Sequence, residues 1–143
     1  MDNWKSSFLE KLHRAQEQCA RKFSDAIEQS VVPVFDDLAE FLRDNGFTAS
    51  TPLRESDHRS FKMELAENAY VLMIFRFTGV GEFELRTETF VPGAEPILDK
   101  SPCRVVDIDH DWAQRKFHDA LDRFVDLLAG QKAAADAEEL VAV

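Results

Sequence analysis

Apolar residues recur at steps of three and four along the first third of the chain. They are Trp4, Phe8, Leu12, Ala15, Cys19, Phe23 and Ile27, and the pattern resumes at Val34, Phe35, Leu38, Phe41 and Leu42. This spacing places them on one face of a helix, because an α-helix turns once in about 3.6 residues. Asn45-Gly46 is a typical helix end. The pattern therefore predicts a long helix over residues 3–45.

Pro33 interrupts this helical pattern. Proline has no N–H, its ring clashes with the preceding turn, and it disfavours helical angles at Val32. Since neither glycine nor a polar loop lies nearby, we predict a kink and not a wide break. In the alternative, Ser30 caps a second helix and Pro33 lies in its first turn, where N–H groups have no intrahelical partner.

After Gly46 the period of the pattern changes to two. Apolar and polar residues alternate over residues 61–66 and 82–89, which is typical of half-buried strands. Residues 70–77 are apolar at nearly every position and predict a central strand that is covered on both faces. Residues 47–53 contain a proline and fit an edge strand.

The connections between these strands are short, which predicts an antiparallel meander of three to five strands. We expect a loop from Pro92 to Pro102, and residues 104–108 are a candidate for one more short strand. Asp111 and Gln114 have the spacing of a capping box, and the helix that follows is expected to stop at Gly130.

The predicted fold class is therefore α+β. It has a long, kinked N-terminal helix, a meander sheet and a C-terminal helix, packed as two layers with helices on the sheet. Residues 1–130 form one domain in this interpretation. Residues 131–143, which are rich in Ala and Glu, form a frayed or disordered tail.

Composition and charge narrow the functional classes. The chain has 143 residues, of which 45% are apolar and 31% charged, as expected of one folded domain. A net charge of −10 repels phosphate backbones and anionic bilayers, so we expect neither nucleic-acid nor membrane binding. The first residues do not resemble a secretory signal, and Cys19 and Cys103 are isolated. We therefore expect a cytoplasmic protein.

The charge is unevenly distributed. Residues 1–24 hold five basic and three acidic residues, which leaves a charge of −12 for the rest of the chain. A basic front helix could therefore lie against an acidic body, either its own or a partner's. The alternative is an ordinary mixed, solvated helix face.

The length of the front helix suggests self-association. An unbroken helix over residues 3–45 spans about 65 Å, whereas a compact chain of this size has a radius of gyration of about 14–15 Å. Trp4, Phe8 and Leu12 therefore lack an intramolecular partner unless the chain folds back. We predict a homodimer whose interface includes these residues and one apolar face of residues 70–77, with Met73 and Phe75. The two terminal helices either cover one sheet face each or share a face.

The densest set of potential metal ligands comprises Asp107, Asp109, Asp111, His110 and His118. The Asp-x-Asp-x-Asp spacing begins like a calcium-binding loop, but the sixth and twelfth positions carry Trp and His where that loop needs Gly and Glu. Aspartates before a helix ordinarily cap it. We therefore expect no cofactor, and we keep Asp107, Asp109 and His118 only as weak candidates for a metal site.

Arg76 is a charged residue within the apolar central segment. It can pair with a glutamate on a neighbouring strand. Alternatively, Arg76 and Tyr70 border a ligand pocket in which the guanidinium binds a carboxylate or phosphate.

The leading hypothesis is a non-catalytic protein-interaction module that self-associates. One alternative is a small-molecule-binding domain with a cavity between helix and sheet. Another is an enzyme or metal site around Asp107, Asp109, His110 and His118. Small acidic α+β dimers that mask partner proteins, such as bacterial secretion chaperones, are similar in size and charge, which is an analogy of composition.

Overall fold

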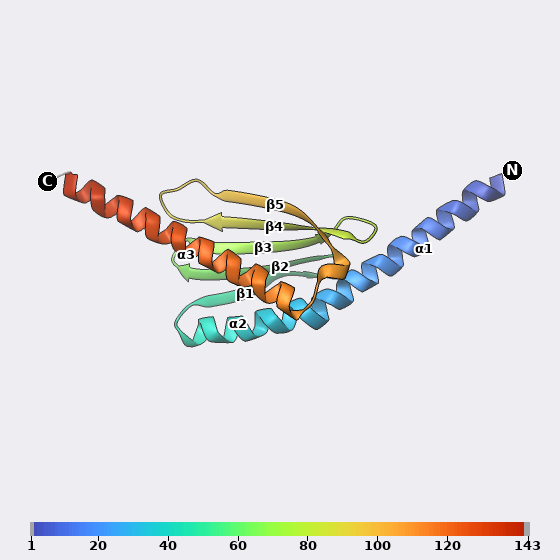
Figure 1. Ribbon diagram of the computed structural model, residues 1–143, viewed down its shortest axis with the longest axis horizontal. Coiled ribbons are helices and arrows are strands. Elements are labelled where there is room, and N and C mark those ends of the chain that lie inside the picture. The colour runs from blue at the N-terminus through green and yellow to red at the C-terminus, as the bar shows by residue number, and fades with distance from the viewer. Residues whose placement is uncertain (1, 142–143) are drawn as a thin grey trace.

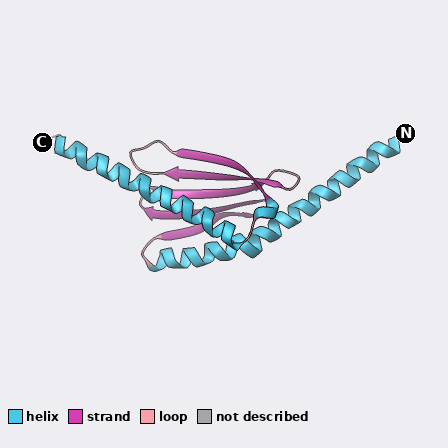
Figure 2. Ribbon diagram, viewed as in Figure 1, coloured by secondary structure: helices cyan, strands magenta, loops and turns pink. Residues whose placement is uncertain are grey.

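The computed structural model describes residues 2–141, with side chains from residue 3 to residue 130 (Figure 1). The helical elements are α1 (Asp2–Ala26), the π-helix η1 (Ile27–Val31), α2 (Val32–Asp44), the 3-10 helix η2 (Val105–Asp107) and α3 (His110–Val141). The strands are β1 (Thr48–Glu55), β2 (His58–Ala66), β3 (Ala69–Phe77), β4 (Glu82–Phe90) and β5 (Ile97–Arg104). The predicted α+β architecture is confirmed: a long N-terminal helix, a five-stranded meander and a C-terminal helix on the sheet (Figure 2).

The three segments α1, η1 and α2 follow one another without a loop and change direction where they meet (Figure 1). The backbone N–H of Val32 donates to the carbonyl of Ile27, five residues earlier, which makes a π turn. Pro33 lies in the first turn of α2. Because proline crowds the carbonyl four residues before it, the helix widens just upstream. The predicted kink is therefore present, and its irregular hydrogen bonding precedes Pro33.

The π turn keeps one row of side chains on the sheet. Phe23, Ile27 and Val31 are spaced four residues apart, and all three are completely buried. In a regular α-helix each step of four residues turns the side chain by about 40° beyond a full circle. The wider π turn offsets part of this drift, so the row continues into the buried residues of α2.

The end of α2 at Asn45-Gly46 is as predicted. Gly46 has a φ of 85°, and its N–H donates to the carbonyl of Arg43 at 3.1 Å, while the N–H of Phe47 donates to that of Leu42 at 2.9 Å. These two bonds form a Schellman motif, which requires a left-handed residue where glycine is favoured.

The sheet has the order β1-β2-β3-β4-β5, with every neighbouring pair antiparallel. β1 is an edge strand, as predicted, and its register shifts between Ser50 and Leu53, where Pro52 lies. The loop expected from Pro92 to Pro102 is wrong from Ile97 onward, because β5 begins there and pairs with β4. The short strand expected at residues 104–108 is also wrong, because most of that segment is η2.

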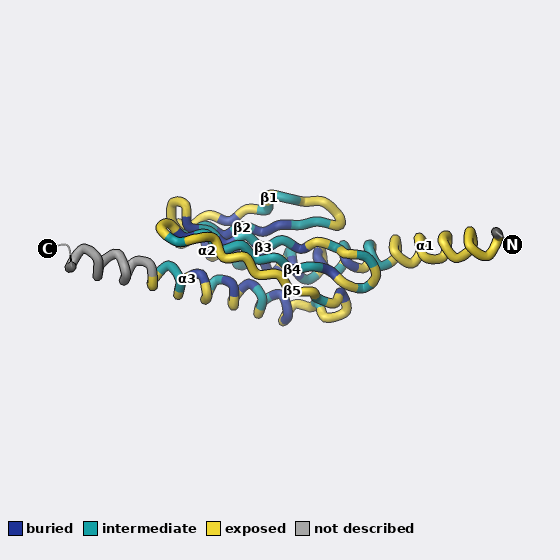
Figure 3. The backbone as a smooth tube through the Cα atoms, turned by 90° about the horizontal axis from the view of Figure 1, so that it is seen from above, coloured by how far each residue is buried: buried dark blue, intermediate teal, exposed yellow. Residues whose placement is uncertain are grey.

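Helices α2 and α3 both cover one face of the sheet, here called the inner face, and among residues 2–141 no helix lies on the opposite, outer face (Figure 3). Of the two arrangements left open for the terminal helices, the structure has the one in which both share a face, in agreement with the predicted two layers. The outer face of β3, which was expected to be covered, is only partly buried within the described residues. A phenylalanine cluster joins the two layers. The ring of Phe117 lies 5.6 Å from those of Phe35 and Phe61, and 6.4 Å from that of Phe75, measured between centroids.

α3 begins earlier than the capping-box spacing predicted. The side-chain carboxylate of Asp109 accepts the N–H of Trp112 at 2.7 Å, so Asp109 and not Asp111 caps the helix. Gly130 does not end the helix, which continues to Val141. The frayed or disordered tail over residues 131–143 stays a prediction. The structure describes no side chains in this segment, and residues 142–143 lie outside the described part of the chain.

Candidate functional site

The face of α1 that precedes the body is exposed and apolar. The exposed fractions are 71% for Trp4, 52% for Phe8, 61% for Leu9 and 37% for Leu12. The rings of Trp4 and Phe8 stack on each other at 5.9 Å. In Figure 3 this part of α1 extends beyond the body, and its residues are exposed. We call the four residues the α1 stripe; no described residue outside α1 covers it.

Lysines border the α1 stripe. Lys5 and Lys11 each lie three residues from Phe8. Lys22 lies three residues after Cys19, which continues the same apolar row of the helix. All three lysines therefore lie on the side of α1 that carries the stripe. None of these lysines forms an ion pair with a side chain that the structure describes.

The acidic residues of α1 are partly occupied by contacts within the helix. Glu10 pairs with Arg14 at 3.7 Å, and Glu17 pairs with His13 at 3.1 Å. Both pairs follow the i,i+4 spacing that brings side chains together on a helix surface. The three lysines beside the stripe, together with Arg21, therefore carry positive charge that no described side chain pairs with.

The predicted interface divides between two environments. The structure places Trp4, Phe8 and Leu12 at the surface, whereas Met73 is 1% exposed and Phe75 is completely buried. Alternation along β3 points Met73 and Phe75 to the inner face, where the helices cover them. Their inclusion in an interface is therefore corrected: they belong to the core of the subunit.

The outer face carries the predicted ligand residues, Arg76 and Tyr70. Arg76 lies directly opposite Glu84 on β4 and pairs with it at 3.6 Å. Tyr70 stacks on Phe90 at 5.4 Å, and the ammonium of Lys62 lies 4.5 Å from the Tyr70 ring. Cross-strand partners thus occupy both residues, and neither lines the two large grooves described below.

The aspartates and histidines near α3 do not converge. Asp109 caps α3, while Asp107, His110 and His118 are exposed. Among the described residues, no three His, Cys, Asp or Glu side chains lie close enough together to hold a metal ion. The structure therefore gives the enzyme and metal hypotheses no geometric support at these positions.

The α2–α3 groove has a volume of about 670 Å³ and lies between the two body helices. It is lined by Val34, Asp37, Leu38, Glu40, Phe41, Asp44, Gln114, His118, Leu121 and Asp122. Of these lining residues, all within the described part of the chain, four are acidic and none is Lys or Arg. Phe41 is 62% exposed, so this groove combines an apolar surface with a negative border.

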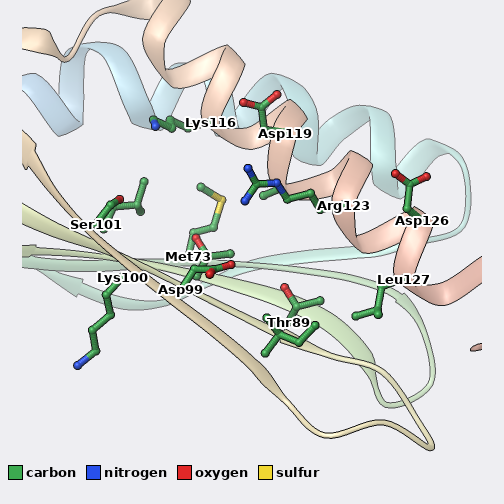
Figure 4. Close-up of a pocket in the computed structure, with 14 residues that line it drawn as sticks. Met73, Thr89, Asp99, Lys100, Ser101, Lys116, Asp119, Arg123, Asp126 and Leu127 are labelled. Carbon is green, nitrogen blue, oxygen red and sulfur yellow. The ribbon is translucent and has the colours of Figure 1, made fainter. Parts of the chain in front are cut away.

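A second groove, the α3–β5 groove, has a volume of about 690 Å³ and lies between α3 and the β4–β5 edge of the sheet (Figure 4). Met73 and Leu85 contribute its apolar floor, and Lys116, Arg123 and Asp119 reach it from α3. The charges around this groove are of both signs, in contrast with the α2–α3 groove.

Comparisons with known protein families, with curated proteins and with solved structures found no match. Among the described helices, none is both long and apolar enough to cross a bilayer. The candidate surfaces of this chain are therefore defined by its own geometry: the α1 stripe and the two grooves.

The sequence predicted three of the four residues of the α1 stripe, all but Leu9, and it raised a cavity between helix and sheet without the residues that line the α3–β5 groove. The α2–α3 groove was missed. Leu38 and Phe41 continue the same apolar pattern as the core residue Leu42, so the pattern alone assigns them to the core. The apolar residues of α2 nevertheless span more than one helix face. That breadth was the available signal that α2 presents a second apolar surface.

Proposed function

We propose that the protein is a non-catalytic interaction module that self-associates as a homodimer through the α1 stripe. The observation that carries this proposal is the exposure of four large apolar side chains, Trp4, Phe8, Leu9 and Leu12, on a helix that extends past the body. Contiguous exposed apolar surface on a folded protein commonly marks an interaction site.

The energetics favour a partner for this stripe. Fully burying a large apolar side chain contributes about 1.5–3 kcal/mol, and between 37% and 71% of the surface of each stripe residue is still accessible in the single chain. Four such residues on each of two subunits therefore supply several kcal/mol toward association, part of which offsets the entropy of bringing two chains together.

The experiment is the mass of the full chain by sedimentation equilibrium across a micromolar concentration series. We expect a dimer that dissociates on dilution, and a weaker dimer for Phe8→Ser. Val125→Ser is the matched control, because Val125 is an exposed apolar residue on α3 that lines neither groove. A wild-type chain that stays monomeric at the highest concentration would overturn the proposal.

A second candidate function, small-molecule binding, is favoured by the α3–β5 groove. Its volume of about 690 Å³ is within the range of ligand sites. Its apolar floor beside Lys116 and Arg123 suits an apolar ligand with an anionic group (Figure 4).

The probe is anilinonaphthalene sulfonate, an apolar anionic dye. Thr87→Trp, which fills the groove, should abolish its fluorescence while Phe8→Ser retains it; the opposite pattern would refute binding in this groove.

A further inference from the structure

The α2–α3 groove and the α1 stripe are complementary in chemistry. The groove has an apolar surface that includes Leu38, Phe41 and Leu121, and four carboxylates along its border. The part of α1 from Trp4 to Lys22 holds five basic and two acidic residues, a net charge of +3. An apolar helix face with a basic border thus corresponds to an apolar groove with an acidic one.

The arrangement of charge around α1 makes the match directional. Lys5, Lys11 and Lys22 lie beside the stripe, while Glu10 and Glu17 lie on the other side of the helix and contact Arg14 and His13. A helix that places its stripe in an acidic groove therefore brings its lysines toward carboxylates and keeps its own carboxylates in water.

Other surfaces of a second copy fit the α1 stripe less well. Pairing α1 with α1 places residues 4–22, which carry a net charge of +3, against the same residues of the second copy. On the outer face the charged residues already pair with one another, as Arg76 does with Glu84 and Arg86 with Glu88. Like charges at an interface suppress association, so electrostatics selects the α2–α3 groove.

The chain cannot fill its own groove in this conformation. α1 extends away from the body and is joined through η1 to α2 (Figure 1). The α1 stripe and the groove beside α2 therefore lie toward opposite ends of this continuous helical segment. A second copy has the required helix. If the helical segments of the two copies run antiparallel, each α1 lies along the other copy's α2, and the same pair of surfaces is used twice.

We propose that α1 of each copy occupies the α2–α3 groove of the other, with Phe8 and Leu12 against Phe41 and Leu121 and with Lys11 near the acidic border. This inference rests on the proposed self-association and names its acceptor surface. The resulting dimer is closed, because the α1 stripe and the α2–α3 groove of each copy are both filled by the other copy.

The test is charge reversal on the two surfaces of the full-length chain, with dissociation constants from sedimentation equilibrium. The α1 variant is Lys5→Glu with Lys11→Glu, and the groove variant is Asp37→Lys with Asp122→Lys. Exposed ion pairs contribute about 0.2–1 kcal/mol each, and a two-fold dimer repeats every contact. We expect each variant to raise the dissociation constant at least about tenfold. Combining all four changes in one chain should return the dissociation constant to the wild-type value, because the charges on α1 and on the groove are again opposite in sign.

The control is Glu67→Lys with Glu95→Lys, which changes the net charge as much as the groove variant does, at exposed residues away from the groove. Circular dichroism checks that every variant folds. If Phe8→Ser weakens the dimer but the groove variant behaves like its control, self-association stands and the groove assignment is wrong. If the groove variant weakens the dimer and the combined variant does not restore it, the pairing of these two surfaces is likewise wrong.

Discussion

Phe117→Ala is expected to separate folding from association in this protein. Phe117 is completely buried on α3, and its ring contacts those of Phe35 on α2 and of Phe61 and Phe75 on the sheet. Truncating a buried phenylalanine costs about 3–5 kcal/mol, because transfer free energy is lost and a cavity remains. A loss at the upper end is expected here, since the missing ring joins three elements that cannot all shift inward.

The expected change in melting temperature follows from chain length. The entropy of unfolding is about 2.1 cal/mol/K per residue, which gives about 0.3 kcal/mol/K for 143 residues. A loss of 3–5 kcal/mol therefore lowers the melting temperature by about 10–17 °C. The assay is thermal and urea unfolding followed by circular dichroism at several protein concentrations, because association stabilises the folded state by mass action.

The matched comparison is Phe8→Ala, the same substitution at an exposed site. With no described partner outside α1, it should change the stability of the single chain by less than about 0.5 kcal/mol and should reduce only the concentration dependence. A loss at Phe8 as large as that at Phe117 would show that α1 packs onto its own body. A loss below about 1 kcal/mol at Phe117 would contradict the role of the cluster.

Three further substitutions test local structure through the free energy of unfolding from urea titrations. Asp109→Ala should destabilise by about 1 kcal/mol, because the N–H of Trp112 loses its cap, and Asp109→Asn should restore most of it; an equal loss for both would contradict capping. Ser60→Ala should cost about 1–3 kcal/mol, since the N–H of Leu53 at the bulge donates to that hydroxyl at 3.0 Å, and an unchanged stability would show another acceptor. Gly46→Ala should cost about 1–2 kcal/mol because its φ of 85° strains an L-residue; a gain in stability would be evidence against the Schellman end of α2.

Periodicity predicted the elements whose two faces differ. Along β3, fully buried Val71 and Met73 alternate with half-buried neighbours, and β2 and β4 show the same period. β5 was missed because it is an edge strand with little buried surface: its residues are exposed except for Cys103, and it contains Pro102. Without a buried face, a strand leaves no alternating pattern.

The candidate site was predictable only in part. The exposure of Trp4 and Phe8 followed from helix length, because a rod longer than its body must extend past it. Alternation places Met73 and Leu72 on opposite faces of the sheet, but it does not show which face the helices cover. Met73 and Phe75 were assigned to an interface for that reason. The α2–α3 groove depends on where α3 packs beside α2, and the spacing of Phe41 within α2 contains no such information.

The meander order of the sheet also bears on how quickly the protein folds. Each strand pairs only with its neighbours in sequence, through connections of a few residues, so each ladder closes a short loop. Short loops lose little chain entropy when they close, and proteins rich in local contacts fold fast. Segments that are far apart in the sequence meet where α3 packs beside α2. We therefore expect the sheet to form early in folding and the helical layer to complete the core in the slower step.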